Sequence, residues 1–468
     1  MPLFPTAQLA EWSRGRWTVP PGAPVTGFGH DTRTLRPGQV FVALATGRRD
    51  GHAFLRAAQA AGAAGAIVQR ADPALPLSQL VVSDPLTAFQ AIARAHRRTF
   101  AGPVIGITGS AGKTSTKDLL SALLGGDRDV LATEGNLNNH IGVPLTLTRI
   151  DAAVHRFAVV EAGVGATGEM APLAEMISPD LALITLVAPA HLAGLGDVEG
   201  VAREKALLPA ALRATGVALF PRHCEQFGAF RDLRVRRIVI EPAEVVLPSE
   251  PAHDRVYFAI SQRGDGTALT IVYPAIAARL KFTLQRVSAG MAQNAVLAIC
   301  AALWLGVTPA MVQARIGAWQ LARWRAQMRH ERGRFLYLDF YNANPASMVD
   351  ALDNFESLAP SVRPRAYVLG CMEELGARTA EYHRQLGRAL RLRPEDRLFI
   401  VGDHAGEVRA GLLEAGGDPE QIQIAAAAAD LAATLAEFRG SVFLKGSRRY
   451  QLEKALAGEA GEREPVAC

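Results

Sequence analysis

Short apolar runs recur along the chain, and longer segments with helical spacing separate them. An apolar run of a few residues that is bounded by turn residues predicts a strand buried on both faces, which is typical of parallel sheets. Such runs lie at residues 40–44, 66–68, 104–108, 157–160, 181–187, 335–339, 366–369, 398–401 and 442–444. Because helix-like segments connect them, the pattern predicts an α/β fold.

Two breaks in this pattern divide the chain into three predicted domains. A helix that ends in basic residues is followed by Gly102 and Pro103, and a second helical stretch, residues 294–305, ends before Gly306. We therefore expect a small N-terminal α/β domain over residues 1–98, a central ATPase-like domain with a parallel sheet over residues 99–306, and a C-terminal domain over residues 307–468.

The C-terminal range alternates most regularly between strand and helix. Three of its predicted strands are followed by glycine, at Gly370, Gly402 and Gly446. This pattern is typical of a Rossmann-like, doubly wound sheet, whose ligands bind at the carboxyl ends of the strands. A short alanine run at residues 425–429 favours a helix.

Composition limits the classes of function. Of the 468 residues, 49% are hydrophobic and 20% are charged, which is typical of a globular protein of about three domains. A formal net charge of +5 favours phosphate-bearing small molecules but is too small to indicate a nucleic-acid partner. The longest apolar stretch, residues 181–190, is shorter than the roughly 20 residues that span a bilayer.

The N-terminal residues and the cysteine spacing indicate the cellular compartment in which the protein is expected. The chain does not begin with a basic segment followed by an apolar core, so we expect no secretory signal. The cysteines are too far apart in the sequence for a paired metal site or a dense disulfide framework, and they are Cys224, Cys300, Cys371 and Cys468. We expect a cytoplasmic monomer without a nucleic-acid or membrane partner.

A glycine-rich loop at residues 106–114 follows a predicted strand and opens a predicted helix. Gly109 and Gly112 allow backbone amides to converge on phosphate oxygens, and the start of a helix favours negative charge. Lys113 neutralises charge on the β- and γ-phosphates, and the Thr114 hydroxyl ligates Mg²⁺. The loop therefore predicts binding of a nucleoside triphosphate.

The spacing of this loop differs from the usual pattern. Glycine is expected at position 107, where the chain has isoleucine, and Gly106 stands one residue early. The alternative interpretation is an ordinary turn between a strand and a helix.

Two further side chains follow predicted strands of the central range. Glu161 follows the strand at 157–160, and His191 follows the strand at 181–187. A carboxylate and an imidazole at the carboxyl ends of parallel strands are suited to hold Mg²⁺ beside a phosphate loop. Taken singly, a Glu or His at the end of a strand is more often a surface group that has a local partner. These features predict an Mg²⁺-dependent ATPase or ligase and leave the two open.

Motifs in all three predicted domains resemble the Mur ligase family, in the family's order. They lie at residues 31–33, 37–44 and 50–52, at 108–114, 134–139, 141–144, 191–192 and 200–205, and at 341–345, 369–376, 383 and 445–448. Tyr-Asn-Ala-Asn-Pro at 341–345 is typical of the branch that adds D-alanyl-D-alanine.

The resemblance implies a reaction and its cofactors. In this family the γ-phosphate of ATP is transferred to a substrate carboxylate, and an amine attacks the resulting acyl phosphate. The implied substrates are UDP-MurNAc-tripeptide and D-alanyl-D-alanine, and the implied products are UDP-MurNAc-pentapeptide, ADP and phosphate. The implied cofactors are ATP and two Mg²⁺ ions, and the process is peptidoglycan synthesis.

The resemblance also implies roles for individual residues. The catalytic set is Lys113, Glu161, His191 and Lys205. The ATP set is Gly109, Gly112, Lys113, Thr114, Ser115, Asn294, Arg325 and Asp339, in which Asn294 opens a helix near the adenine. The substrate set is Thr32, Arg33, Asn138, Asn139, Asn342, Asn344, Ser447 and Arg448. The metal ligands are Thr114, Glu161, His191 and, once carbamylated, Lys205.

Lys205 needs that modification, because an ordinary lysine with a pKa near 10.4 is a cation and cannot ligate Mg²⁺. The alternative for Lys205 is a solvated lysine on a helix, and the alternative for Arg33 is a loop residue at the surface.

Six positions differ from the family pattern. They are Leu186, Ala193, Met291, Trp324, Leu338 and Cys371. The phosphate loop is unaffected, but these differences keep two other hypotheses open. One is a Mur-type ligase with a different amine or carboxylate substrate, and the other is a nucleotide-binding regulatory protein without turnover.

Overall fold

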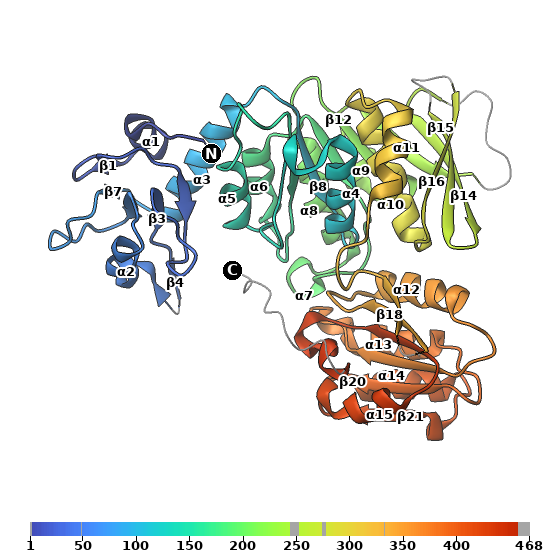
Figure 1. Cartoon of the computed structure of the whole chain (residues 1–468). Coiled ribbons are helices and arrows are strands. Elements are labelled where there is room, and N and C mark those ends of the chain that lie inside the picture. Colours follow the sequence, from blue (N-terminus) through green and yellow to red (C-terminus); the bar gives the residue numbers. More distant parts are fainter. Residues whose placement is uncertain (1, 48, 244–251, 274–277, 332, 457–468) are drawn as a thin grey trace.

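The computed structural model describes residues 2–47, 49–243, 252–273, 278–331 and 333–456, and these form three lobes in chain order. Figure 1 shows the N-terminal lobe in blue and the C-terminal lobe in orange and red, each adjoining the central lobe. Each lobe has its own β-sheet, built mainly of parallel strands. The predicted α/β class is confirmed.

The N-terminal sheet runs in the order β1-β7-β6-β3-β2, and only β1 pairs with its neighbour in the antiparallel sense. Its strands are β1 (Arg16–Trp17), β2 (Gly27–Gly29), β3 (Gln39–Val42), β6 (Gly65–Val68) and β7 (Gln79–Val81). Helices α1 (Thr6–Ser13) and α3 (Pro85–Thr99) pack on one face, and α2 (Leu55–Ala60) packs on the other. A small hairpin of β4 (Ala45–Thr46) and β5 (Arg49–Asp50) precedes α2.

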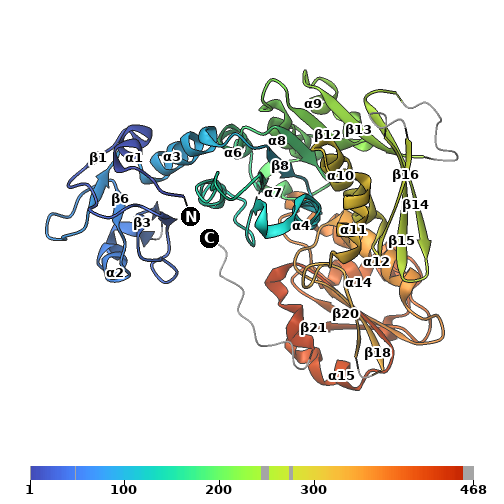
Figure 2. The same cartoon turned by 45° about the horizontal axis from the view of Figure 1, so that its top comes forward.

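Arg97 fixes the end of α3 to the central lobe. This arginine is 2% exposed, and its guanidinium donates to the backbone oxygens of Ile177 and Ser178, each at 2.9 Å. It also donates to the Asp180 carboxylate at 2.9 Å. A buried guanidinium must have partners for its donors. This contact therefore joins the N-terminal and central lobes, as the two views in Figures 1 and 2 show for α3.

The central sheet runs in the order β16-β15-β14-β13-β12-β11-β8-β10-β9. Its strands are β8 (Val104–Thr108), β9 (Val130–Ala132), β10 (Phe157–Glu161), β11 (Leu181–Ile184), β12 (Val217–Pro221), β13 (Arg237–Pro242), β14 (Arg255–Arg263), β15 (Gly266–Tyr273) and β16 (Ala278–Gln285). Helices α4 (Lys113–Leu124), α10 (Ala289–Trp304) and α11 (Pro309–Ala318) cover one face. Helices α5 (Gly142–Leu147), α6 (Met170–Ile177) and α8 (Val198–Ala210) cover the other.

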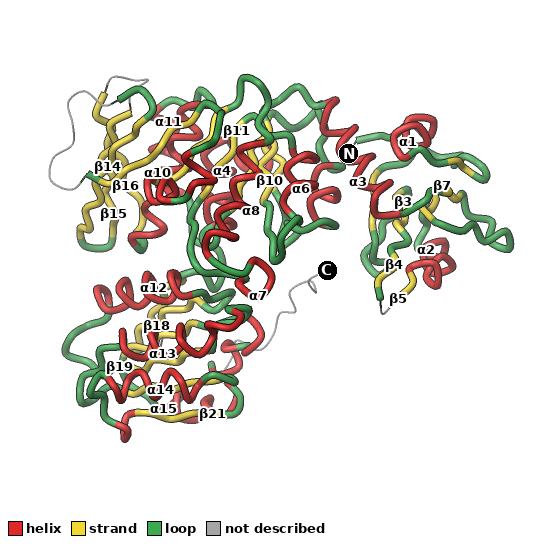
Figure 3. Tube along the Cα trace, turned by 180° about the vertical axis from the view of Figure 1, so that it is seen from behind, coloured by secondary structure: helices red, strands yellow, loops and turns green. Residues whose placement is uncertain are grey.

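The C-terminal sheet runs in the order β17-β18-β22-β19-β20-β21, with an antiparallel edge strand β17. Its strands are β17 (Gln327–Glu331), β18 (Arg334–Asp339), β19 (Arg365–Gly370), β20 (Arg397–Val401), β21 (Ile422–Ala425) and β22 (Ser441–Lys445). Helices α12 (Pro345–Leu358), α13 (Thr379–Ala389) and α14 (Ala405–Glu414) pack on one face. The other face is covered by α15 (Ala432–Glu437) and neighbouring 3-10 turns. Figure 3 shows the helices and strands of this lobe from behind.

Three details differ from the sequence predictions. The strand predicted at 181–187 ends at Ile184, because the following residues form a loop against the phosphate loop. Helix α10 begins at Ala289, since the Ser288 side chain caps it by accepting a hydrogen bond from Met291 N at 3.2 Å. Asn294 therefore lies in the second turn and does not open the helix. The alanine run is divided between the end of β21 and a 3-10 turn.

The second predicted domain junction, near residue 306, also needs adjustment. Helix α11 follows it and packs on α4 and β16 of the central lobe. Trp319 is buried in the central core, whereas Trp324 is buried in the C-terminal core. A junction between these two tryptophans is therefore the better proposal.

Among the described residues, no helix is long and apolar enough to cross a membrane. Cys224, Cys300 and Cys371 are buried and free, and Cys468 lies outside the described residues.

Candidate active site

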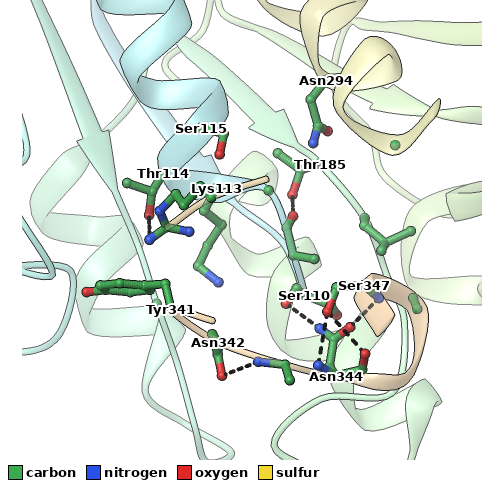
Figure 4. Close-up of a pocket in the computed structure, with 18 of the residues that line it drawn as sticks. Ser110, Lys113, Thr114, Ser115, Thr185, Asn294, Tyr341, Asn342, Asn344 and Ser347 are labelled. Carbon is green, nitrogen blue, oxygen red and sulfur yellow. Dashed lines mark hydrogen bonds between the residues drawn. The ribbon is translucent and has the colours of Figure 1, made fainter. Parts of the chain in front are cut away.

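A cavity of about 590 Å³ opens between the central and C-terminal lobes. Its volume is typical of a small-molecule site. The structure brings most of the sequence-predicted residues to its walls, and Figure 4 labels several of them. They are Gly112, Lys113, Thr114, Ser115, Asn138, Asn139, Glu161, His191, Asn294, Arg325, Asp339, Asn342 and Asn344.

The loop between β8 and α4 requires glycine at two positions. At Gly112 the φ angle is +78°, and a Cβ there would lie 2.2 Å from Asn294 Nδ2. At Gly109 the φ angle is +155°, and a Cβ would lie 1.9 Å from Thr185 Oγ1. No other residue fits this space or adopts such angles without strain. The loop is therefore packed closely against Asn294 and Thr185, and it lies at the start of α4, where backbone amides and the helix dipole favour a phosphate.

Neighbouring strands hold this loop in place. Ser110 N donates to Leu186 O at 2.7 Å, and Thr185 Oγ1 donates to Ala111 O at 2.5 Å. Lys113 Nζ donates to Gly109 O at 2.8 Å, so the lysine lies folded over its own loop. Burial lowers the pKa of Lys113, while the charge of Glu161 opposes that change.

Glu161 lies at the end of β10 with its side chain directed at the start of α4. It is 1% exposed, and its two carboxylate oxygens accept hydrogen bonds from Thr114 Oγ1 at 2.9 Å and Asn138 Nδ2 at 2.8 Å. Both donors are uncharged, although a buried carboxylate is stabilised best by a cation. The pair of oxygens from Thr114 and Glu161 suits a hard divalent ion such as Mg²⁺.

Arg325 enters the cavity from the segment that leads into the C-terminal lobe. Its guanidinium donates to Thr114 Oγ1 at 3.1 Å and lies 4.1 Å from the centre of the Tyr341 ring. Figure 4 labels both of these contact partners, Thr114 and Tyr341, in the cavity. A positive charge from beyond the central lobe therefore reaches the phosphate loop.

The C-terminal lobe contributes a polar wall to the cavity. Asp339, at the end of β18, forms an ion pair with Lys445 Nζ at 2.6 Å, and Lys445 is 2% exposed. Asn344 caps α12 through Ser347 N at 2.9 Å and donates to Ser110 O of the phosphate loop at 2.9 Å. This amide links the two lobes directly.

Lys205 lies in α8 and is 1% exposed, which contradicts the alternative of a solvated lysine. Burial, followed by the charge of Lys113, lowers the pKa of Lys205 to about 7. About half of the amine is therefore neutral at pH 7.

His191 and Glu374 meet at the junction of the lobes. His191 precedes α7 (Leu192–Leu195), and its Nδ1 is hydrogen-bonded to a carboxylate oxygen of Glu374. Among the described residues, no group of three or more His, Cys, Asp or Glu is arranged to hold a metal by itself. Mg²⁺ usually takes few protein ligands together with substrate phosphates, so these residues still fit the ion.

Four predicted substrate residues lie away from the cavity walls. Thr32 and Arg33 are in the N-terminal lobe, where Arg33 is paired with Asp31 and its side chain is 75% exposed. Ser447 and Arg448 follow β22. Their roles, and those of the other site residues, stay predictions.

Arg448 is packed within its own lobe. Its guanidinium lies 5.0 Å from the ring centre of Trp324 and 2.8 Å from both carboxylate oxygens of Glu453. Trp324 adopts a left-handed backbone, with a φ angle of +60°, although it is 2% exposed.

The sequence analysis did not single out several residues of the site. They are Ser110, Thr185, Asp350, Glu374 and Lys445. Lys445 ends the buried strand β22, which is the signal that identified Glu161 and would have found Lys445 too. Thr185 follows β11, but it lay inside the strand predicted at 181–187, so that signal would have missed it.

Comparisons with known proteins agree with this architecture. Residues 107–302 match the Mur ligase middle domain, and residues 324–448 match the Mur ligase, glutamate ligase domain. The chain is 31% identical over 393 residues to the UDP-N-acetylmuramoyl-tripeptide–D-alanyl-D-alanine ligase of Bacillus subtilis, covering 83% of each chain. It is 32% identical over 430 residues to the Escherichia coli protein of the same name, covering 91% of this chain and 92% of that one. A crystal structure of MurF from Acinetobacter baumannii superimposes with a TM-score of 0.84 at 26% identity, covering 97% of this chain and 98% of that one.

Proposed function

Because the chain belongs to the Mur ligase family, we propose that it is an ATP-dependent ligase that adds D-alanyl-D-alanine to UDP-MurNAc-tripeptide. The products are UDP-MurNAc-pentapeptide, ADP and phosphate. The enzyme acts in the cytoplasm, as a monomer, in peptidoglycan synthesis. Two relatives with this activity in their names align over most of the chain, and a MurF structure has the same three lobes.

The contact between Arg325 and Thr114 carries the proposal. It places a guanidinium from the edge of the C-terminal lobe 3.1 Å from the Thr114 hydroxyl, at the end of the phosphate loop. Lys113 and Arg325 would therefore flank the triphosphate from two lobes. Such an arrangement suits phosphoryl transfer, in which catalysis depends mainly on positioning and charge neutralisation.

The chemistry requires activation because a carboxylate is a poor electrophile. Its oxygen attacks the γ-phosphorus of ATP, the bond to the β-phosphate oxygen breaks, and an acyl phosphate and ADP result. The free amine of the dipeptide then attacks the carbonyl carbon. The carbon–oxygen bond to phosphate breaks, phosphate leaves, and the nitrogen loses a proton as the amide forms. Lys113 and Arg325 stabilise the charge on the phosphates during both steps.

Mg²⁺ bound here would neutralise phosphate charge and orient the phosphates. We assign one ion to Thr114 and Glu161, and a second to His191 and a carbamylated Lys205. The neutral amine of Lys205 can add to CO₂, losing a proton and becoming an anionic carbamate. Its lowered pKa supports this modification.

We assign the remaining residues by lobe. Thr32 and Arg33 hold the UDP group, and Asn138 and Asn139 lie between that group and the phosphate loop. Ser115, Asn294 and Asp339 contact ATP together with Gly109 and Gly112. The C-terminal face that closes over ATP and the dipeptide is formed by Asn342, Asn344, Ser447 and Arg448.

A coupled assay tests the activity. The purified protein is supplied with ATP, Mg²⁺ and UDP-MurNAc-tripeptide, with and without D-alanyl-D-alanine, and phosphate release and product mass are measured. We expect phosphate release to require the dipeptide and the product to have the mass of the pentapeptide. Tripeptides with lysine or diaminopimelate at position three identify the acceptor.

The same assay separates the other hypotheses. A panel of amino acids and dipeptides reveals a different amine substrate if one supports faster phosphate release. A regulatory protein would bind ATP without turnover, and Lys113→Ala would then change nucleotide affinity alone.

A further inference from the structure

Glu374 connects the C-terminal lobe to the histidine at the edge of the cavity. It lies in the loop after β19, and its carboxylate accepts a hydrogen bond from His191 Nδ1. Its backbone oxygen accepts a second hydrogen bond, from Ala193 N in α7, at 3.1 Å. One residue thus makes two contacts across the junction, and Figure 1 shows α7 between the two lobes.

Both partners adopt a backbone conformation that is unfavourable for them. The φ angle is +53° at His191 and +63° at Glu374, in the left-handed region that favours glycine. Strain at non-glycine residues persists only where the surroundings hold it, and it concentrates at functional sites. Here Leu192 and Leu375 belong to one buried apolar cluster that spans the junction.

The hydrogen bond determines which nitrogen of His191 is available. A carboxylate only accepts hydrogen bonds, so Nδ1 carries a proton, and in the neutral imidazole Nε2 then keeps its lone pair. A histidine that ligates a metal usually donates its other ring N–H to a carboxylate or a carbonyl in this way. The pairing with Glu374 is therefore the arrangement expected behind a metal ligand, and His191 lines the cavity.

We propose that Glu374 is a positioning residue that prepares His191 for a divalent cation and so couples metal affinity to docking of the C-terminal lobe. The inference rests on the proposed function, in which His191 serves the second ion. The carboxylate belongs to a different lobe, so the pair exists only when the lobes are docked. If docking of the C-terminal lobe raises the affinity for the metal by some factor, then metal binding must raise the equilibrium constant for docking by the same factor.

Mn²⁺ binding to the full-length protein tests this coupling. Binding is measured in the presence of ADP from the electron paramagnetic resonance signal of the free ion. Glu374→Gln keeps a hydrogen-bond acceptor but removes the charge, and we expect about 10- to 100-fold weaker affinity at one site. Glu374→Asn, which tolerates the left-handed backbone better, should weaken binding in the same direction.

Two comparisons show whether Glu374 acts through His191. His191→Ala should weaken the same site, and the double variant Glu374→Gln/His191→Ala should bind no more weakly than His191→Ala alone. Glu373→Gln is the matched control, because the Glu373 carboxylate pairs with Tyr450 and Arg449 within its own lobe. Its Mn²⁺ affinity should equal that of the wild type.

Small-angle scattering supplies the reciprocal measurement. Mn²⁺ with ADP should make the wild-type protein more compact, and Glu374→Gln should need a proportionally higher Mn²⁺ concentration for the same change. Wild-type Mn²⁺ affinity in Glu374→Gln, or fully additive losses in the double variant, would overturn the proposal. Wild-type affinity in His191→Ala would overturn it together with the metal role of His191. Ligation dependent on D-alanyl-D-alanine reports the proposed function separately.

Discussion

Burial and the positive charge of Lys113 together lower the pKa of Lys205 to about 7. Lys113 is the first residue of α4, whereas Lys205 lies in α8, and we propose different roles for the two lysines. Their mutual repulsion means that the charge held by the phosphate loop influences whether Lys205 is neutral. The first two predictions follow from this relationship.

Carbamylation of Lys205 should depend on pH. With a pKa of about 7, the neutral fraction of the amine rises from about 10% at pH 6 to about 90% at pH 8. In ¹³C-labelled bicarbonate, the carbamate signal in an NMR spectrum of the protein should therefore grow over this range. Lys205→Arg, which stays charged, should lack the signal. Equal signals at pH 6 and pH 8 would contradict the lowered pKa.

Lys205 should also make stability depend on pH when CO₂ is absent. Its folded-state pKa of about 7 is below the value of about 10.4 in an unfolded chain. The unfolded state binds more protons between these values, so this group's contribution to the free energy of unfolding rises with pH across that window. Lys205→Met should therefore gain more stability over wild type at pH 7 than at pH 9.5, as measured by urea denaturation. The same substitution at the exposed Lys454 should show no such difference.

Tyr341 should support ATP binding through Arg325. The guanidinium lies 4.1 Å from the ring centre, and such a contact contributes about 0.5–2 kcal/mol. Tyr341→Leu should raise KM for ATP about 2- to 30-fold and change kcat less, whereas Tyr341→Phe should keep KM near the wild-type value. If Tyr341→Phe raised KM for ATP as much as Tyr341→Leu does, the effect would come from the phenolic hydroxyl and not from the ring.

Asp339 should stabilise the C-terminal lobe by pairing with Lys445. Asp339→Asn leaves a lysine that is 2% exposed without its anionic partner, which costs about 3–5 kcal/mol in the free energy of unfolding. Urea denaturation should show this loss, and Asp339→Asn/Lys445→Met should recover part of it. Asp353→Asn, at an exposed position, is the control and should change stability by less than about 0.5 kcal/mol.

Trp324 should stabilise the protein despite its strained backbone. Glycine at this position would relieve a left-handed φ that costs about 1–3 kcal/mol. Removing a buried indole costs about 3–5 kcal/mol, so burial is the larger effect. Trp324→Gly should therefore lower the melting temperature, and Trp324→Phe should lower it less. A higher melting temperature for the glycine variant would show that strain is the larger effect.

The local parts of the site could be predicted from the sequence. Lys113 and Thr114 lie in one loop, and Glu161 ends a neighbouring strand, so strand order alone suggests that they meet. Arg325 reaches Thr114 from 211 residues away in the sequence. The family resemblance assigned Arg325 to ATP, and its contact with Thr114 was not predicted.

The role of Glu374 and the strands β14, β15 and β16 could not be predicted from the sequence. Glu374 stands beside another glutamate, and only its backbone angle and direction distinguish the two. Strands β14, β15 and β16 escaped prediction because they are partly exposed, and polar residues interrupt their apolar runs. Tertiary contacts determine whether such segments form strands, and these contacts cannot be inferred from short apolar runs in the sequence.

The anchoring of α3 by Arg97 has a consequence for dividing the molecule. A fragment beginning at residue 99 would lose Arg97, and the carbonyls of Ile177 and Ser178 would lose their buried donor. The N-terminal lobe is therefore not a detachable unit, and a separately produced central lobe should be insoluble or unfolded. The other junction lies between Trp319 and Trp324, whose side chains belong to the cores of different lobes, so a reporter inserted between them should respond to any movement of the C-terminal lobe.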